Sequence, residues 1–148
     1  MTSSEDSPTD RSQTSSPVRI LVIDDELILL TALSGTLRRA GYFVRTAHSA
    51  ERGLALLEQE AADVIITDVI MPRKSGVDVI AKVRELYPAT RVIAMSGGGN
   101  FGPSDYLPGS ITTSAYLLAS ERAGAHAVLA KPFEASEIIA VVRQVLGT

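Results

Sequence analysis

Three carboxylates, one hydroxyl and one ammonium each stand where a short aliphatic run of this sequence ends. Asp24 and Asp25 follow the first run, and Asp68 follows a later run after a single threonine. Ser96 follows another run, and Lys131 follows the last one. Ligands of open α/β sheets bind at the carboxyl ends of the strands, near a switch in strand order. If these runs are parallel strands, the five side chains share one rim of a sheet.

Such a cluster is suited to a divalent cation and a phosphoryl group. Carboxylates that lie close together repel one another, so one of them keeps its proton unless a cation intervenes. Hard oxygen ligands select Mg²⁺ or Mn²⁺ over zinc, and Mg²⁺ is commonly held by one or two carboxylates together with phosphate oxygens. Lys131 would neutralise one phosphoryl oxygen as a point charge, and the hydroxyl of Ser96 would donate a hydrogen bond to another.

The nucleophile of this chemistry is predicted to be Asp68. A carboxylate can attack phosphorus directly and form an aspartyl-phosphate. In-line transfer depends on positioning and charge neutralisation more than on covalent help from the protein. In the expected sheet, Asp68 lies on the central strand, between the strands that carry Asp25 and Ser96.

Alternating aliphatic runs and amphipathic patterns from Val18 onward predict the fold. Four runs are rich in Val and Ile without polar alternation, which is typical of strands covered on both faces. A fifth segment, 42–47, contains Arg45 and Thr46 and suits an edge strand. We predict an α/β fold, a doubly wound five-stranded parallel sheet with helices on both faces and the flavodoxin-like order 2-1-3-4-5. The four buried runs are 20–23, 64–66, 92–95 and 127–130.

Four helices are predicted from apolar residues at steps of three and four. Gly41 is a C-terminal signal for the first helix, Ser49 an N-cap for the second, and Pro88 the end of the third. A further helix is expected over about 113–122, ending before Gly124. The apolar sets are Leu29, Leu33, Leu37 and Ala40; Ala50, Leu54 and Leu57; Val79, Val83 and Leu86; and Ile138, Val142 and Val145, with Gly147 just beyond.

The composition is that of one globular domain. The chain has 148 residues, of which 45% are hydrophobic and 21% charged, and this length fits a single domain. Residues 1–17 are dominated by Ser, Thr, Pro and Asp, so we predict a disordered N-terminal tail there. The folded domain is expected over 18–148, with an extended loop at about 97–114.

Several classes of protein are disfavoured by the same composition. The net charge is -3, without the clustered basic face of a nucleic-acid binder. No run is long enough to cross a bilayer and no signal peptide is present, so we expect no membrane insertion and a cytoplasmic location. The sequence has no cysteine, which excludes disulfides and thiol chemistry. The isolated His48 and His126 are expected to be ordinary surface or loop residues.

Four segments, LVIDDE, VIITDVIMP, IAMSG and AVLAKPF, occur in this order. Together they make the chain from about Arg19 to Leu146 resemble the receiver domain of two-component response regulators (CheY-like), of the single-domain type. The resemblance implies that Asp68 accepts a phosphoryl group from a sensor histidine kinase or a phosphotransfer protein, with Mg²⁺ as cofactor. It also implies that phosphorylation changes the contacts with a downstream protein, and that the chain catalyses only its own phosphorylation and dephosphorylation.

The resemblance also implies roles for individual residues. Ser96 would contact the phosphoryl group, and Lys131 corresponds to the lysine of the family, whose bond to the following proline, here Pro132, is typically cis. Output is expected on the face formed by the fourth helix, the fifth strand and the fifth helix. The implied metal ligands are the carboxylates of Asp24, Asp25 and Asp68 and the backbone carbonyl of Ile70.

Two features depart from the family pattern. Val128 occupies a position that is often aromatic, so we expect it to pack in the last strand. Ser96 and Lys131 are 35 positions apart, which is longer than usual and places an insertion within 97–114. Long loops are often functional, so this one is expected either to remodel the partner surface or to be a passive insertion.

Three other functions compete with this interpretation. A phosphate sink within a relay is the main alternative, and it would lack a partner whose affinity changes on phosphorylation. A haloacid-dehalogenase-like phosphatase needs a second aspartate two residues after the nucleophile, where this chain has Ile70. Gly97, Gly99 and Gly102 match a dinucleotide fingerprint, but Pro103 interrupts the helix that would bind the pyrophosphate.

Overall fold

The computed structural model describes residues 17–69, 76–96 and 118–148. The predicted loop at 97–114, and the predicted N-terminal tail apart from Pro17, lie outside these ranges. Residues 118–123 are helical. The strands are β2 (Arg19–Ile23), β3 (Phe43–Ala47), β4 (Val64–Asp68), β5 (Arg91–Ser96) and β6 (Ala127–Ala130). The labelled helices are α2 (Leu27–Arg39), α3 (Ala50–Gln59), α4 (Gly76–Leu86) and α6 (Ala135–Leu146).

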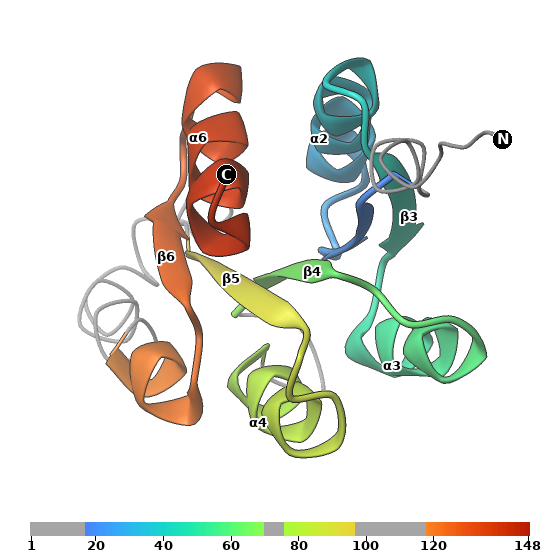
Figure 1. Cartoon of the computed structure of the whole chain (residues 1–148), viewed down its shortest axis with the longest axis vertical. Coiled ribbons are helices and arrows are strands. Elements are labelled where there is room, and N and C mark those ends of the chain that lie inside the picture. The colour runs from blue at the N-terminus through green and yellow to red at the C-terminus, as the bar shows by residue number, and fades with distance from the viewer. Residues whose placement is uncertain (1–16, 70–75, 97–117) are drawn as a thin grey trace, which may run out of the picture.

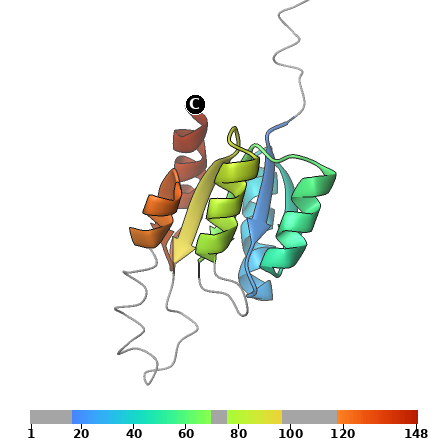
Figure 2. The same ribbon diagram turned by 90° about the horizontal axis from the view of Figure 1, so that it is seen from below.

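The five strands form one parallel sheet in the order β3-β2-β4-β5-β6. Counted along the chain this is 2-1-3-4-5, which confirms the predicted fold class. Helices α2 and α6 cover one face, while α3, α4 and the helical residues 118–123 cover the other (Figure 1). The strands run toward the same end of the sheet (Figure 2). The segment with Arg45 and Thr46 is an edge strand, as predicted.

The central strands divide their aliphatic side chains between two hydrophobic clusters. Ile20 and Val22 pack with residues of α2 and α6, whereas Leu21 and Ile23 pack with residues of α3 and α4. This division follows from the alternation of side chains along a strand. Each fully buried aliphatic side chain contributes about 1.5–3 kcal/mol to stability. The strand interiors therefore hold the fold together, and the strand ends are available for polar side chains.

Most of the predicted helix boundaries are confirmed. The side chain of Ser49 accepts a hydrogen bond from the backbone N–H of Arg52 at 3.1 Å and caps α3. Gly147 ends α6 in the left-handed conformation, with φ of 79°. The helical residues 118–123 end before Gly124, whose φ is 115°, whereas the expected start of this helix at about 113 lies outside the described ranges. No helix within the described ranges is long and apolar enough to cross a membrane.

The predicted apolar face of α2 is confirmed at Leu33 and Leu37, which are buried, and is wrong at its two ends. Ala40 is exposed, and Leu29 is only half-buried while its neighbour Leu30 is buried. The buried stripe also includes Ser34, whose hydroxyl donates a hydrogen bond to the carbonyl of Thr31 at 3.1 Å. A prediction based on apolar residue types does not identify a buried serine of this kind. The helix is capped by the residue before Gly41, which itself follows with φ of 101°.

The predicted burial of Leu86 at the end of α4 was wrong. Leu86 is 53% exposed, because it is the last residue of the helix. Tyr87 packs against the cluster beneath α4 in its place. The aromatic residue after the helix thus closes this side of the core.

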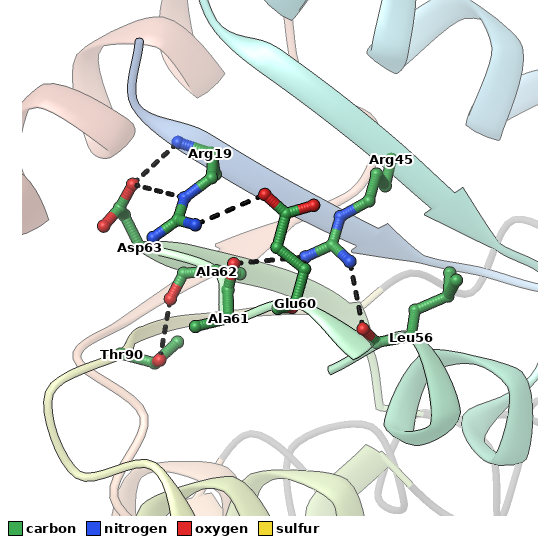
Figure 3. A network of polar contacts seen from close by, with 8 residues as sticks. All are labelled: Arg19, Arg45, Leu56, Glu60, Ala61, Ala62, Asp63 and Thr90. Carbon is green, nitrogen blue, oxygen red and sulfur yellow. Dashed lines mark hydrogen bonds and ion pairs between the residues drawn. The ribbon is translucent and has the colours of Figure 1, made fainter. Parts of the chain in front are cut away.

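At the opposite end of the sheet from the strand tips, two arginines join β2, β3 and α3 to the start of β4 (Figure 3). Arg19 lies 3.3 Å from Glu60 and 3.7 Å from Asp63. Arg45 binds carbonyl groups in the last turn of α3 and just beyond it. Its guanidinium donates to the carbonyls of Leu56, Glu60 and Ala61, at 3.0, 2.8 and 3.3 Å.

Candidate functional site

The strand register brings the ends of β2 and β4 level with each other. Ile23 pairs with Thr67, so Asp24 and Asp68 leave neighbouring strands at the same height. On the other side of β4, β5 ends at Ser96. The predicted carboxylates and the hydroxyl therefore come from three adjacent strands at one rim of the sheet.

The three aspartates lie close enough to share a cation. Each of Asp24, Asp25 and Asp68 offers a carboxylate oxygen, and these oxygens lie within 4.8 Å of one another. Asp24 and Asp68 are buried, whereas Asp25 is exposed. One oxygen of Asp24 accepts a hydrogen bond from the backbone N–H of Glu26 at 2.8 Å, which fixes the orientation of this carboxylate.

Lys131 places its ammonium group among these carboxylates. The nitrogen lies 2.9 Å from Asp24 and 3.5 Å from Asp68. A third carboxylate, that of Glu26, also lies 3.5 Å away. Only 10% of the lysine side chain is exposed. The ammonium is therefore oriented by three anions in a largely buried setting.

Burial and neighbouring charges shift the pKa values of Asp24 and Lys131 in opposite directions. Burial raises the pKa of Asp24 above its ordinary value, although Lys131 and the N–H of Glu26 oppose the shift. Burial by itself lowers the pKa of Lys131, but the carboxylates of Asp68, Asp24 and Glu26 outweigh it, and the net pKa is raised. Lys131 is therefore firmly protonated, and burial makes Asp24 easier to protonate than an ordinary aspartate.

The hydroxyl of Ser96 is buried, and no hydrogen-bond partner for it occurs within the described part of the chain. A buried polar group left without a partner costs about 1–3 kcal/mol. The backbone around it is fixed, because the N–H of Lys131 donates to the carbonyl of Ser96 at 2.6 Å. The next peptide bond, between Lys131 and Pro132, is cis. A donor is thus held at the rim with its hydrogen-bonding capacity unused among the described residues.

The structure adds two residues that the sequence interpretation had not assigned. Glu26 pairs with Lys131, and Gly76 at the start of α4 lies against the backbone of Asp68. Glu26 could have been suspected because it is the third consecutive acidic residue in the LVIDDE segment. A glycine opening a helix was the only hint of Gly76. Conversely, Ile70, expected as a backbone ligand, lies outside the described residues.

Val128, at the position that is often aromatic, is half-buried and packs against the cluster on the α3 and α4 face. This agrees with its expected place in the last strand. The described contacts of Val128 are those of a core residue.

The model of the response regulator receiver domain matches residues 20–103, more than half of the chain. The chain belongs to this family. The matched range of the receiver includes Asp24, Asp68 and Ser96 but ends before Lys131. The position of Lys131 beside the two aspartates comes from the structure.

Curated relatives of this receiver are longer regulators. It is 34% identical over 133 residues to the DNA-binding transcriptional regulator NtrC of Azospirillum brasilense, covering 90% of this chain and 25% of the relative. It is 30% identical to the transcriptional regulatory protein CpxR of Klebsiella pneumoniae, covering 86% of this chain and 49% of the relative. The chain thus spans between a quarter and a half of these relatives.

Solved structures of comparable length share the fold of this receiver. A CheY-like receiver domain protein from Methanospirillum hungatei is 26% identical, with a TM-score of 0.75 and coverage of 89% of this chain and 95% of that one. A putative response regulator from Chloroflexus aurantiacus is 30% identical, with a TM-score of 0.74 and coverage of 90% and 100%. Receiver domains bind Mg²⁺ at an acidic cluster, and this receiver has such a cluster.

Proposed function

We propose that Asp68 accepts a phosphoryl group from the phosphohistidine of a sensor kinase or a phosphotransfer protein, and that this modification changes the receiver's contacts with a downstream protein. One observation carries the proposal. The protonated Lys131 lies 3.5 Å from Asp68, beside a group of three carboxylates suited to a hard cation.

The chemical step is an in-line displacement at phosphorus. A carboxylate oxygen of Asp68 forms the new P–O bond while the P–N bond to the donor imidazole breaks, and the departing ring nitrogen takes up a proton. The phosphoryl group carries up to about two negative charges at neutral pH. Lys131 pairs with one of its oxygens, and Ser96 supplies the hydrogen-bond donor that has no partner among the described residues.

The donor set of the rim suits Mg²⁺. When bound, this ion neutralises charge on the transferring group and helps to orient it. The carboxylates of Asp24, Asp25 and Asp68 would hold it, since carboxylate oxygens are the ligands that Mg²⁺ prefers. The contribution expected from Ile70 remains a prediction.

Phosphorylation acts on output by biasing an equilibrium between two conformations of the receiver. The phosphoryl group favours whichever arrangement of Lys131 and Ser96 surrounds it best. A regulator has a partner whose affinity for the receiver changes on phosphorylation, whereas a phosphate sink has none. Titrating candidate partners with the free and the beryllofluoride-bound receiver separates these two roles.

The decisive experiment compares the wild type with Asp68→Asn. Each protein is incubated with acetyl phosphate and Mg²⁺, and intact mass spectrometry records the added phosphoryl group. Asp63→Asn is the control, because Asp63 lies at the opposite end of the sheet, beside Arg19. We expect modification of the wild type and the control, and none of Asp68→Asn. A modified Asp68→Asn protein, or a wild type that stays unmodified, would refute the proposal.

A further inference from the structure

The first residue of α4 lies directly against the backbone of Asp68. Gly76 is buried, and its N–H donates to the carbonyl of Val69 at 3.0 Å. A Cβ atom placed on Gly76 would overlap the carbonyl oxygen of Asp68. It would also lie 2.6 Å from the Cα of Val69 and 2.9 Å from the carbonyl carbon of Asp68. Alanine therefore does not fit at this position without a shift of backbone atoms.

The backbone on the strand side of this contact is held in place. The N–H of Val69 donates to the carbonyl of Met95 at 3.0 Å. The carbonyl of Asp68 accepts a hydrogen bond from the hydroxyl of Thr67 at 3.0 Å, inside the protein. A side chain on Gly76 would push against a peptide that is tied both to β5 and to its own strand.

The helix side of the contact is held as well. Val79, Ile80 and Val83 of α4 are fully buried in the cluster between this helix and the sheet. Moving α4 away from the sheet would open space among these side chains, at a cost that grows with the volume of the cavity. A Cβ on Gly76 would therefore be accommodated partly by a small shift of α4 away from the sheet and partly by a small rotation of the 68–69 peptide.

We propose that Gly76 is a positioning residue for the phosphoacceptor, an inference that rests on the proposed function of Asp68. The missing side chain lets α4 pack against the 68–69 peptide. This contact fixes the direction in which the Asp68 carboxylate leaves the end of β4. The distances from the Asp68 carboxylate to Lys131, Asp24 and Asp25 depend on that direction.

The expected consequence is a loss of rate larger than the loss of stability would explain. Displacements of about 1 Å at a reacting group can cost about 100-fold in rate. We expect Gly76→Ala to lower the rate of phosphorylation by acetyl phosphate about 10- to 100-fold, measured well below its melting temperature. Near-ultraviolet circular dichroism at that temperature verifies that the variant is folded.

Two glycine variants separate positioning from general damage. In Gly53→Ala the new Cβ would press on the flexible side chain of Ile23 within the same hydrophobic cluster, so stability falls while the Asp68 peptide is untouched. In Gly35→Ala the new Cβ is 3.4 Å from the end of the Arg39 side chain, an ordinary contact. Both controls are expected to be phosphorylated within about twofold of the wild-type rate, since neither moves a reacting atom.

A measurement on the wild type applies even if Gly76→Ala does not fold. The hydrogen bond from Gly76 to Val69 predicts slow exchange of the Gly76 amide proton with solvent, compared with exposed amides. Free exchange of this amide would overturn the inference. So would wild-type phosphorylation of folded Gly76→Ala, or an equal slowing in a Gly53→Ala protein of matched stability. If the wild type itself is not phosphorylated, the proposed function fails instead.

Discussion

Lys131 lies closer to Asp24 than to Asp68, with its ammonium nitrogen 2.9 Å from the former and 3.5 Å from the latter. Asp24 is fully buried, so the lysine compensates a carboxylate that has little access to water. A phosphoryl group on Asp68 would compete for the same ammonium. The ion pair with Asp24 and a phosphoryl group on Asp68 would therefore depend on the same ammonium group.

Removing this cation should destabilise the protein. Breaking a buried ion pair by deleting one partner costs about 3–5 kcal/mol, because a buried charge is left uncompensated. We expect Lys131→Met to lower the free energy of unfolding by about 3 kcal/mol in the absence of Mg²⁺. Urea denaturation measures this, with Lys82→Met on the exposed side of α4 as control. Equal losses in the two variants would show that the pair with Asp24 contributes little.

Mg²⁺ should stabilise the folded receiver. A ligand that binds only the native state adds about 2.7 kcal/mol when its concentration is 100 times its dissociation constant. We expect Mg²⁺ to raise the melting temperature of the wild type, and Asp25→Asn to lose most of this rise, because Asp25 is the exposed member of the proposed ligand set. Asp78→Asn, an exposed change on α4, is the control. An Asp25→Asn protein that responds fully to Mg²⁺ would exclude this residue as a ligand.

Ser96→Ala should separate stability from phosphoryl binding. The serine hydroxyl is buried and has no partner among the described residues, so its loss should leave the free energy of unfolding unchanged or raise it by about 1 kcal/mol. The same change should weaken beryllofluoride binding by about tenfold or more, since one hydrogen bond to a charged group is worth about 1.5–3 kcal/mol. Fluorine NMR titration measures the affinity.

Ser34→Ala is the matched control for that experiment. Ser34 is also buried, but its hydroxyl already donates to the carbonyl of Thr31. We expect this variant to be destabilised by about 1 kcal/mol with an unchanged affinity for beryllofluoride. If the two serine variants behave alike, Ser96 has no special part in binding the phosphoryl group.

His126 should make stability depend on pH. Its Nδ1 accepts a hydrogen bond from the N–H of Val92 at 3.0 Å, which a protonated ring cannot do. Partial burial of the ring and the charges of Arg84 and Arg91 lower the pKa of His126 below its ordinary value, although the residue as a whole is exposed. The unfolded chain therefore binds this proton more readily, so the contribution is complete above the unfolded pKa and is lost as pH falls through the folded one.

The test compares His126→Ala with His48→Ala. Because His126 is exposed, we expect His126→Ala to cost only about 0.5 kcal/mol near pH 7.5 and less near pH 5.5, where the wild type has lost part of this contribution. Denaturation with urea at the two pH values measures the difference. His48 is the second histidine of the chain and is exposed. Equal pH dependence in the wild type and His126→Ala would contradict the prediction.

Arg45 should contribute to stability without affecting the chemistry. Its guanidinium binds three carbonyl groups around the end of α3, at the opposite end of the sheet from Asp68. Arg45→Met should lower the free energy of unfolding by about 1.5–3 kcal/mol, the range for a hydrogen bond to a charged group. Phosphorylation by acetyl phosphate should remain at the wild-type rate. Arg52→Met, an exposed change on α3, is the control.

The strand order and the polar rim could be predicted because both follow from local pattern and general rules. Continuous aliphatic runs mark strands buried on both faces, and parallel strands end at the same rim. Asp24 and Asp68 therefore lie at adjacent strand ends, as the sequence suggested.

The rest depended on contacts between distant segments. The orientation in which α2 packs against the sheet determines whether Ser34 or Leu29 faces the core. The approach of Gly76 to Asp68 brings together backbones that are separated along the chain by residues outside the described ranges. The bond from Val92 to the ring of His126 joins residues 34 positions apart. Residue type gives no signal for the first and third of these features, and for the second it gives only the hint of a glycine at the start of a helix.

Neither hydrophobic cluster includes Asp68 or its partners at the rim. The aliphatic clusters that hold the fold and the proposed phosphoryl site therefore use different side chains, although Lys131 is expected to contribute to both stability and phosphoryl binding. A relative in which the carboxylate of Asp68 is replaced would keep both clusters. By the proposed function, it would bind a kinase without accepting its phosphoryl group. Natural selection on solubility alone would not remove such a protein.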